Sequence, residues 1–389
     1  MSDLACDVAV VGGSLAGSAA AGALSRGGAS AVVLEKALFP RQKICGSFLS
    51  AEAEPVLKRL GALDEIRATG AETIHRFALV RPDGRRVEVD LPAPVLSISR
   101  ARLDSLVAAA AERHGARIRF GVAVTSFEGN LREGFRLMFP GGELSARVVL
   151  GAWGRYSPLD GRLGREFFGL PAPLFGFKKH LSGRHEHLAG RAVLHLFEGG
   201  YLGLSRVEGA VVNLAALARP RVAQSAHHDF DELLSRLKKE SPSLAADLEG
   251  LSPVPGPVLL SEPVHLGPHG CVAGDILVAG DAAGVIDPFT GTGMALALLS
   301  GEAAADPILR FLAGQLDTDG LKREHSEAYR KIAGRRFAFS RLFRSVFYGG
   351  LASRLVGPAT APLARVAVRL TRGPAGKGSQ STGTPHNRK

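Results

Sequence analysis

The sequence predicts an α/β protein in which a parallel sheet, assembled from three separated segments, is interleaved with an antiparallel sheet and followed by a helical C-terminal tail. Three observations predict this fold class. The chain opens with an apolar strand, a glycine turn, an alanine-rich helix and a second apolar strand, Ala31 to Glu35. Strands of alternating polarity then surround the turn Pro82-Asp83-Gly84. Ile276 to Leu298 finally returns to an apolar strand, a glycine loop and a helix.

The elements follow in an order that alternates between the two sheets. Ala31 to Glu35 reads as a parallel strand because it is apolar throughout, as expected of a strand buried on both faces. A helix begins near Ala51, and Ile74 to Leu91 forms the antiparallel hairpin. The later elements expected are a helix at 102–114, a strand at 117–127, a hairpin at 135–139 and 144–150, strands at 192–197, 201–206 and 210–217, and a helix at 229–240.

These elements predict a domain organisation in which two folds are interleaved. Nucleotide-binding segments are expected at 1–73, 96–164 and 266–315, and substrate-sheet segments at 74–95 and 165–265. A helical region at 316–372 and a Gly/Ser/Thr/Pro-rich, disordered tail at 373–389 complete the chain.

Composition excludes several classes of protein. The chain has 389 residues, 46% of them apolar and 22% charged, which is typical of a globular protein with two or three cores. The net charge of +11 comes from the C-terminal part, because 320–389 contains 15 Lys or Arg and two acids. The remaining chain has 33 basic and 35 acidic residues, so we expect no nucleic-acid partner for the body of the protein.

The expected compartment is the cytoplasm. Three cysteines form no C-x-x-C pair and leave an odd thiol, which favours a reducing environment. The N-terminus lacks the basic region of a secretory signal, and no apolar run is long enough to span a membrane.

The first motif is the glycine turn VVGGSLAGSA, which fits G-x-G-x-x-G only with Ser14 in place of the middle glycine, between Gly12 and Gly17. The turn opens a helix whose N-terminus can hold a diphosphate, and Ser14 is small enough to approach it and donate a hydrogen bond. Glu35 ends the next strand, where an acid accepts ribose hydroxyls and favours FAD or NAD over NADP. Glycines that only punctuate a turn are the alternative. Leu15, Ala16 and Lys36 complete the expected contacts of this region.

The second motif is the segment ILVAGDAAGVIDPFTGTGMALAL, in which Gly280, Asp281, Pro288, Gly291 and Gly293 match GDAAG-x-x-x-P-x-x-G-x-G. It resembles the FAD-dependent aromatic hydroxylase and geranylgeranyl reductase superfamily of flavoproteins. The resemblance implies a Rossmann-like FAD-binding domain with an inserted substrate sheet. It also implies that Asp281 meets the ribityl chain and that the loop with Thr292 and Met294 meets the isoalloxazine.

A third segment, PRQKICGSFLS, resembles a motif of the lipid-directed and secondary-metabolite branches of that superfamily. The resemblance implies that Arg41 and Lys43 neutralise the diphosphate and that Cys45 and Gly46 lie near the flavin; inert packing is the alternative for the thiol. SRARLDSLV is similar to an Arg-bearing helix start of the family. This makes Arg100 an expected flavin contact, with a surface arginine as the alternative. The strand after that helix is expected to meet adenine through the backbone of Val124.

One departure from the family concerns the electron donor. The family's A-D-G is Ala152-Trp153-Gly154 here, so the acid near the nicotinamide path is missing. There is no second dinucleotide fingerprint, so we expect NAD(P)H to bind transiently, with another donor as the alternative. The tryptophan halogenases are excluded because their W-x-W-x-I-P signature needs two tryptophans and this chain has one.

No metal site is expected. His180, His185, His187 and His195 accompany no carboxylate or cysteine in a metal-binding pattern, and neither does the pair 227–228.

The leading hypothesis for function is an FAD-dependent monooxygenase. It would hydroxylate or epoxidise an apolar aromatic, quinone-like or polyketide compound of secondary metabolism, prenylated or not, in a dry pocket. The alternative is an FAD-dependent reductase of isoprenoid double bonds, similar to the geranylgeranyl reductases. A flavin-free protein anchored to lipid is the third hypothesis. The sequence assigns no catalytic acid or base, and Tyr201 in GGYLGLS is the candidate substrate residue, with an ordinary core strand as the alternative.

The C-terminal helix is amphipathic and basic. Its apolar stripe is Phe339, Leu342, Phe343, Val346 and Phe347, opposed by arginines. Such a helix can lie peripherally on the inner face of a membrane, and packing over the substrate domain is the alternative.

Overall fold

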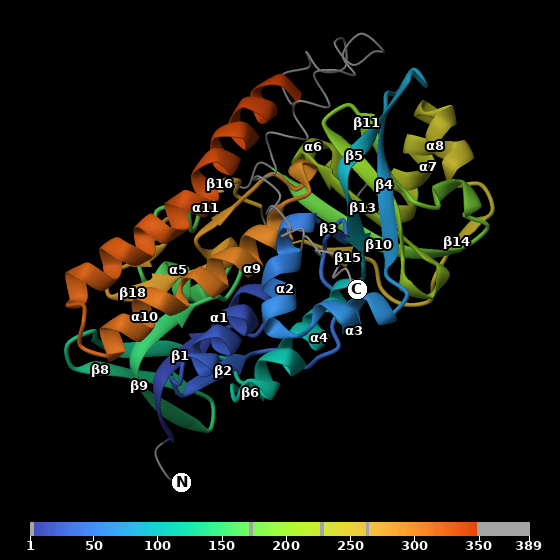
Figure 1. Ribbon diagram of the computed structural model, residues 1–389. Coiled ribbons are helices and arrows are strands. Elements are labelled where there is room, and N and C mark those ends of the chain that lie inside the picture. Colours follow the sequence, from blue (N-terminus) through green and yellow to red (C-terminus); the bar gives the residue numbers. More distant parts are fainter. Residues whose placement is uncertain (1–3, 171–173, 226–228, 262–263, 348–389) are drawn as a thin grey trace, which may run out of the picture.

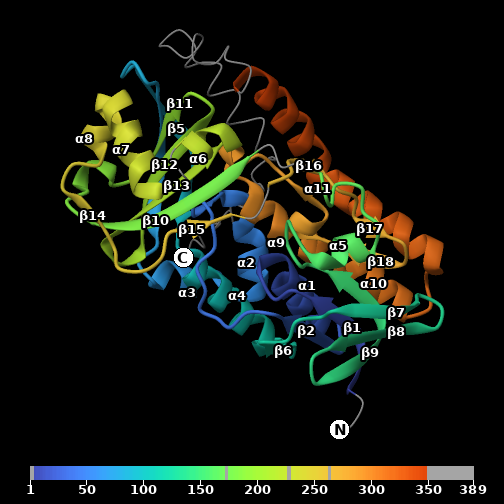
Figure 2. The ribbon, with the colours of Figure 1, turned by 180° about the vertical axis from the view of Figure 1, so that it is seen from behind.

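The computed structural model describes residues 4–170, 174–225, 229–261 and 264–347; of 223–225 and 342–347 only the backbone is described. Two sheets lie at opposite ends of an elongated molecule, and helix α11 (Thr318–Phe347) runs along one long edge (Figures 1 and 2). The arrangement confirms the predicted α/β fold with a second, largely antiparallel sheet and a C-terminal helix.

The first sheet is parallel at its centre and has the order β17-β18-β9-β1-β2-β6. Every residue of β2 is buried, which explains its unbroken apolar run. Helix α1 packs against α4, α9 and α10, so segments far apart in the sequence cover one another. The bounds are β1 (Leu4–Val11), α1 (Leu15–Arg26), β2 (Ala31–Glu35), α4 (Arg100–Arg113), β6 (Arg117–Phe120), β7 (Ser126–Asn130), β8 (Gly134–Phe139), β9 (Gly142–Gly151), β17 (Val272–Ala273), β18 (Ile276–Val278), α9 (Gly293–Ala303) and α10 (Ala305–Leu312).

The second sheet has the order β14-β10-β13-β12-β11-β4-β5-β3. Among its described strands, β4 and β11 pair in parallel and the others are antiparallel. The first hairpin therefore joins the later strands through a parallel contact that local periodicity does not reveal. The bounds are β3 (Phe48–Leu49), β4 (Glu72–Val80), β5 (Arg86–Ser97), β10 (Phe175–Gly183), β11 (Arg191–Phe197), β12 (Gly200–Val207), β13 (Val211–Ala218), β14 (Leu251–Pro253) and β15 (Leu259–Leu260).

The shorter elements connect the two sheets and cover their edges. They are α2 (Glu54–Leu60), α3 (Leu63–Ala68), α5 (Pro158–Arg162), α6 (Pro220–Ser225), α7 (Phe230–Glu240), α8 (Pro242–Asp247), β16 (Gly267–Pro268) and β19 (Gly284–Val285), with single 3₁₀ turns at 51–53, 186–188, 208–210, 280–282 and 288–290.

The two faces of the second sheet have different partners. Alternate residues such as Phe177, Leu202 and Leu214 pack under helices α7 and α8. The residues between them, including Leu79, Leu194, Tyr201 and Leu217, form another apolar cluster that also contains Val285 and Phe289. Because the last two residues belong to the glycine loop before α9, this second face, called the loop-side face below, is directed at the predicted cofactor elements.

One predicted strand needs correction, and one strand is missing from the prediction. The strand expected at 117–127 ends at Phe120, and Val124 lies in the loop between β6 and β7. The N–H of Val122, in the same loop, donates to the carbonyl of Glu35 at 2.9 Å. Strand β10 was not predicted at all. Its sequence FGFKKHLSG carries consecutive charged residues, which obscure the alternation of a half-buried strand.

In the part whose side chains are described, helix α11 packs on elements beside the first sheet and the late glycine loop, and most of the stripe for which packing over the substrate domain was the alternative lies outside that part. The helix contacts α9, α10 and β16 through a buried side formed by Leu321, His325, Tyr329, Ala333 and Ser340. In the predicted apolar stripe, Phe339 is half-buried, and the side chains of Leu342, Phe343, Val346 and Phe347 lie outside the described residues. The tail 373–389 also lies outside them. None of the helices in the described ranges is long and apolar enough to cross a bilayer.

Candidate cofactor site and its substrate face

The glycine turn between β1 and α1 is compressed against the end of β9. Gly12 has a φ of +106°, and a Cβ placed on it would lie 2.4 Å from the carbonyl oxygen of Ala152. A Cβ placed on Gly17 would lie 1.8 Å from the carbonyl oxygen of Gly12. Both positions therefore require glycine, as the motif predicts. Ser14 is the residue before α1, yet its side chain does not cap the helix.

Glu35 holds this turn at the carboxyl end of β2. Its Oε2 accepts a hydrogen bond from the N–H of Gly13 at 2.7 Å, and its Oε1 accepts one from the N–H of Ala37 at 2.9 Å. Each carboxylate oxygen retains a second lone pair, which suits a ribose hydroxyl. Lys36 beside it is exposed.

A buried charged cluster lies behind the turn. Asp104 of α4 is fully buried and accepts hydrogen bonds from Arg100 at 2.9 and 3.0 Å. Lys43 Nζ lies 2.7 Å from the same carboxylate. Ser14 Oγ donates to Asp104 at 3.0 Å and accepts from Arg100 at 2.8 Å. The serine hydroxyl therefore bonds to a carboxylate in this structure, whereas the sequence predicted a bond to a phosphate.

Electrostatics in this cluster favour the charged forms of Asp104 and Arg100. Burial alone would raise the pKa of Asp104, but Arg100 and Lys43 outweigh it and the pKa lies below its usual value. Burial would lower the pKa of Arg100, and Asp104 holds it above its usual value. Burial lowers the pKa of Lys43, with Asp104 opposing that shift.

The late glycine loop meets the early turn at Ala16. A Cβ placed on Gly280, whose φ is +64°, would lie 2.8 Å from the Cβ of Ala16. A Cβ placed on Gly301 would lie 2.1 Å from the carbonyl oxygen of Ala16. These close approaches bring the two predicted cofactor loops together, so both can contact one molecule.

Asp281 occupies this junction. Its carboxylate is partly exposed and has no hydrogen bond to another described residue. Burial raises its pKa, and Arg155, Arg100 and Lys43 act in the opposite direction. A carboxylate in this position can accept hydrogen bonds from hydroxyl groups, as expected for the ribityl chain.

The loop that follows Pro288 leads into α9. Gly291 has a φ of +65°, and a Cβ on it would lie 2.8 Å from Cδ1 of Phe48. Thr292 precedes α9 without capping it, because its hydroxyl pairs with Thr290 at 3.0 Å. The first N–H groups of α9, from Gly293 and the buried Met294, therefore receive no side-chain cap.

The segment with Cys45 and Gly46 rests on the loop-side face of the second sheet. Asn213 donates to the carbonyl of Cys45 at 3.1 Å, and Ser205 donates to the carbonyl of Gly46 at 3.3 Å. The predicted flavin segment is therefore fixed by the substrate sheet. Arg41 is exposed and outside the charged cluster, so Lys43 alone of the two predicted cations joins it.

Tyr201 lies where the second sheet meets the late loop. Its hydroxyl is 3.4 Å from Oδ1 of the buried Asp287, and its ring meets Phe289 edge-on at 6.0 Å between centroids. The side chain is 8% exposed. It therefore joins the loop-side face to the cofactor loop.

Trp153, which replaces the family's acid, has a structural role. Its Nε1 donates to Asp160 at 3.0 Å, and Asp160 pairs with Arg165 at 2.9 Å. Arg165 in turn donates to the carbonyl of Ala282 in the late loop at 2.8 Å. Burial raises the pKa of Asp160, and Trp153 and Arg165 counteract it. The tryptophan thus connects the end of β9 to the cofactor loop.

These residues fit FAD. Helices α1 and α9 both begin at a serine or threonine that leaves the helix N-terminus uncapped, which suits an anion or a carbonyl group. FAD would be held by the turn at Gly12, the carboxylates of Glu35 and Asp281, the cation Arg100 and the N-terminus of α9.

Sequence reasoning missed residues whose partners are distant in the chain. Asp104 follows Arg100 by one helical turn, a spacing that indicates an ion pair but not its burial. Asn213 and Ser205 face the flavin segment only because β12 and β13 pair in this register. Lys178 belongs to the strand that was not predicted.

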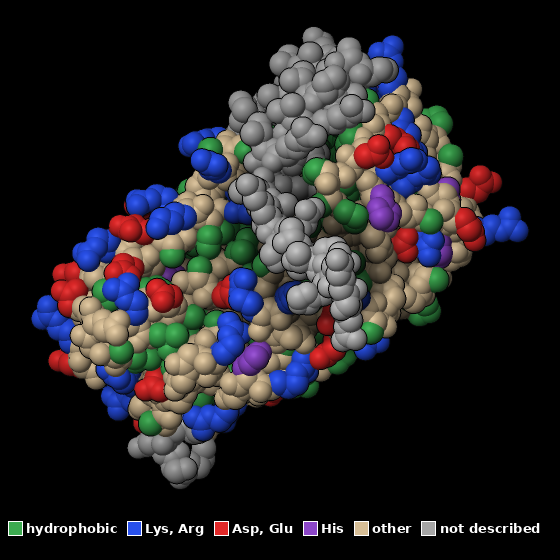
Figure 3. Space-filling model, in the orientation of Figure 1, with side chains coloured by type: hydrophobic (Ala, Val, Ile, Leu, Met, Phe, Trp, Pro, Cys, Tyr) green, Lys and Arg blue, Asp and Glu red, His purple; other side chains and the backbone are tan. Residues whose placement is uncertain are grey.

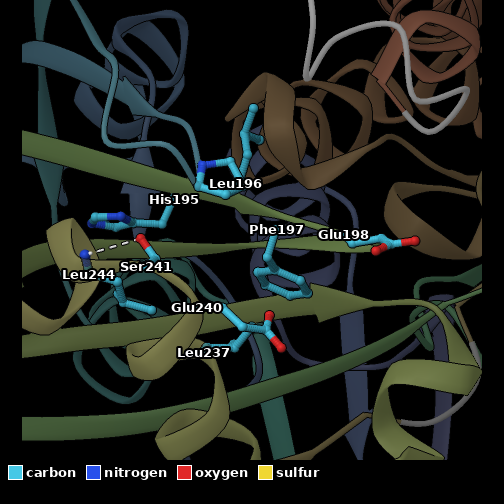
Figure 4. Close-up of a pocket in the computed structure, with 9 residues that line it drawn as sticks. His195, Leu196, Phe197, Glu198, Leu237, Glu240, Ser241 and Leu244 are labelled. Atoms are coloured by element: carbon cyan, nitrogen blue, oxygen red, sulfur yellow. Dashed lines mark hydrogen bonds between the residues drawn. The ribbon is translucent and has the colours of Figure 1, made fainter.

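A cavity of about 240 Å³ lies on the opposite side of the second sheet, under α7 and α8 (Figure 4). His195 lines it and contacts Asp247 at 2.9 Å. His185 and His187 contact backbone carbonyls, and residues 227–228 lie outside the described residues. No group of three His, Cys, Asp or Glu side chains suited to a metal ion occurs in the described ranges.

Comparisons with known proteins agree with this geometry. Residues 5–172 match the family model described as "FAD binding domain". A menaquinone reductase of Mycobacterium tuberculosis is 36% identical over 176 residues, which cover 42% of this chain and 41% of that protein. The matched region thus spans less than half of that relative. The menaquinone reductase of Mycolicibacterium smegmatis is 27% identical over 359 residues, covering 85% of this chain and 81% of the relative.

Solved structures share the fold. A myxobacterial chondrochloren halogenase superposes with a TM-score of 0.77 at 21% identity, covering 96% of this chain and 91% of its own. A flavin-dependent brominase gives a TM-score of 0.75 at 18% identity, covering 94% and 93%. With the two cofactor loops in contact and the FAD-binding domain model matched over residues 5–172, the chain contains an FAD-binding domain and is similar to the FAD-dependent oxidoreductases of the aromatic hydroxylase and geranylgeranyl reductase superfamily.

Proposed function

We propose that this protein is an FAD-dependent reductase of an isoprenoid double bond in a prenylated, quinone-like molecule. The observation that carries the proposal is the loop-side face of the second sheet, where Leu79, Leu194, Tyr201 and Leu217 form an apolar cluster with Phe289 of the late loop. Such a face suits an apolar substrate held against the cofactor. The similarity to menaquinone reductases supports a quinone, and for one of them it extends over 85% of this chain.

The chain supplies orientation and exclusion of water. Bound FAD, once reduced by the electron donor, would supply the hydride. Asn213 and Ser205 hold the carbonyls of Cys45 and Gly46, and this fixes the segment between the sheet and the cofactor loops. The apolar side chains of the loop-side face displace water from the reacting groups. Tyr201 is the proposed substrate-facing residue of this face.

A second candidate is monooxygenation of the same kind of molecule. The dry, apolar face favours it, because an oxygen-transferring flavoenzyme has to exclude water. NAD(P)H is the proposed electron donor for either reaction.

Oxygen dependence distinguishes the two reactions. We would reduce the FAD-loaded protein, add a short-chain menaquinone with or without air, and identify the products by mass. A gain of two hydrogen atoms in both conditions supports the reductase. A gain of one oxygen atom that requires air establishes the monooxygenase and contradicts the reductase. Protein that binds FAD but converts no quinone contradicts both.

A further inference from the structure

Lys178 is a fully buried lysine on the loop-side face of the second sheet. It lies on β10 and is 1% exposed. Its Nζ is 3.4 Å from Oε1 of Gln42, which is a long hydrogen bond. Within the described residues, no carboxylate lies within ion-pair distance of it. An ammonium buried without a counter-ion costs several kcal/mol, so it indicates a group that a ligand completes.

Two further polar side chains beside Lys178 each contain one buried atom without a hydrogen-bond partner. His180 lies two residues along β10 and is paired in register with Asn213 of β13. His180 Nε2 and Asn213 Oδ1 are buried and make no hydrogen bond. Lys178, His180 and Asn213 share one face of the sheet and are called the β10 polar patch. Buried polar atoms are normally satisfied, so an unsatisfied group of this kind indicates a missing partner.

On one side of the β10 polar patch, the neighbouring residues are small or apolar. A row of paired residues crosses the sheet from Lys178 of β10. It passes through Ala215 of β13 and Gly203 of β12 to Leu194 of β11. The same face continues through Leu79. A ligand seated here therefore has a polar group at one end and an apolar body along the sheet.

We propose that the Lys178 ammonium binds an oxygen atom that carries negative charge on the ring of a quinone-like substrate, with His180 and Asn213 as further hydrogen-bonding groups. This assignment rests on the proposed function, because it names the polar end of the same substrate. The ligand class is a hydroxyquinone or hydroquinone anion.

The charge of Lys178 makes this binding dependent on pH. Burial lowers the pKa of Lys178 to about 8, with Cys45 opposing the shift and Arg100 adding to it. The negative charges of Glu208 and Asp104, beyond ion-pair distance, also raise the pKa. Burial lowers the pKa of His180 to about 4, so this ring is neutral when Lys178 titrates. Since the ammonium is lost as pH rises, affinity for an anion falls above about pH 8.

The test compares an anionic ligand with a neutral one of similar size. The FAD-loaded protein is titrated with 2-hydroxy-1,4-naphthoquinone, an anion at neutral pH, and with 2-methyl-1,4-naphthoquinone, and binding is followed by flavin absorbance and calorimetry. Lys178→Met is expected to weaken binding of the anion about 10- to 100-fold and to change binding of the neutral quinone little. The matched control is Lys179→Met, since the next residue of β10 points to the other face.

A pH series keeps the inference testable if Lys178→Met does not fold. Affinity of the wild-type protein for the hydroxyquinone is expected to fall between roughly pH 7 and 9, and Lys178→Arg is expected to remove that dependence. Cys45→Ser is expected to retain it, which excludes titration of the thiol as its source.

Three results would overturn the inference. They are an unchanged anion affinity in Lys178→Met, a flat pH profile in the wild type, and loss of FAD from Lys178→Met, which would assign the amine to the cofactor. Failure of the proposed function gives a different result. Protein that binds the hydroxyquinone with the expected pH dependence but converts no quinone supports the inference and contradicts the proposed function.

Discussion

At the scale of single residues, Gly12 and Gly28 illustrate two different reasons why a position favours glycine: lack of space for a side chain and a positive φ. Both have positive φ, +106° and +89°. A Cβ on Gly12 would collide with Ala152, whereas a Cβ on Gly28 would meet nothing within 4 Å. Gly28→Ala therefore measures backbone strain alone, which costs about 1–2 kcal/mol.

We expect Gly12→Ala to cost more free energy of unfolding than Gly28→Ala and to abolish FAD binding, because the turn has to move away from β9. The measurements are the melting temperature and the flavin absorbance retained per chain. FAD retained by Gly12→Ala at the wild-type level would contradict the predicted role of this turn.

Asp104 allows a second prediction at this scale, about the stability of the fold and its dependence on pH. Asp104→Asn leaves Arg100 and Lys43 buried without their counter-ion, so we expect it to lower the free energy of unfolding by about 3–5 kcal/mol, measured by urea denaturation. The native pKa of Asp104 is lowered, so its contribution is present above its usual pKa of about 4 and is lost as pH falls through the lower native value. The variant should lose that part of the acid sensitivity.

A matched control for Asp104→Asn is Asp83→Asn, which removes a half-exposed carboxylate from an arginine pair. Exposed pairs contribute about 0–1 kcal/mol, so its effect should be small. Equal effects of the two variants would show that the buried cluster does not stabilise the fold.

Sequence rules predict those site residues whose role depends on the local backbone. Gly12 and Gly17 follow from a turn, and Glu35 from the end of a strand. Ser14 illustrates the limit of such rules. Its hydroxyl bonds to Asp104 across 90 residues of sequence, and no local pattern encodes that partner.

At the scale of elements, the contact between α1 and α9 positions both cofactor loops. We expect Gly301→Ala to push α9 away from α1, because its Cβ would lie 2.1 Å from the carbonyl oxygen of Ala16. Overpacking of this kind costs about 1–3 kcal/mol. FAD affinity should fall with stability. The measurements are thermal unfolding with and without FAD and the dissociation constant of FAD.

Gly334→Ala is the matched control, since Gly334 is an exposed glycine inside α11 and a Cβ on it would make only an ordinary contact, 3.8 Å from Cγ of Arg330. It should stabilise the protein by about 0.5–1 kcal/mol. Destabilisation by Gly334→Ala, or unchanged FAD affinity in Gly301→Ala, would contradict this account of the helix contact.

Strands show why part of the fold is not predictable from periodicity. Strands β1 and β2 are predictable from their unbroken apolar runs, because both faces of each strand are buried. Strand β10 was missed because Lys179 interrupts the apolar series of Phe175, Phe177 and Leu181, so the alternation is lost. The parallel pair of β4 and β11 joins segments more than 100 residues apart, and only the assembled sheet reveals it.

At the scale of the whole molecule, one long edge carries a row of basic side chains. Lys and Arg side chains, with a few acids among them, line the edge along which α11 runs (Figure 3). The exposed ones in the described part are Arg323, Arg330, Lys331, Arg335 and Arg341. Sequence composition predicted this asymmetry, whereas the packing of α11 on α9 and α10 required the assembled structure.

We expect the full-length protein to sediment with vesicles that contain anionic lipid and to dissociate as salt increases, since each basic residue near such a surface contributes about 1 kcal/mol. Neutral vesicles are the control. Replacing Lys331 and Arg335 by Glu should weaken binding, and the exposed Lys238→Glu, in α7 on the second sheet, should not. Equal sedimentation with neutral and anionic vesicles would contradict an electrostatic contact.

Helix α11 also holds the cofactor loop. Ser340 Oγ accepts a hydrogen bond from the N–H of Asp287 at 3.1 Å, and Phe337 fills the space that a Cβ on Gly284 would occupy. Asp287 in turn contacts Tyr201. A displacement of the helix would therefore be transmitted mechanically to the site of electron transfer. By thermodynamic reciprocity, any change of redox state that shifts the loop also shifts how firmly helix α11 is seated.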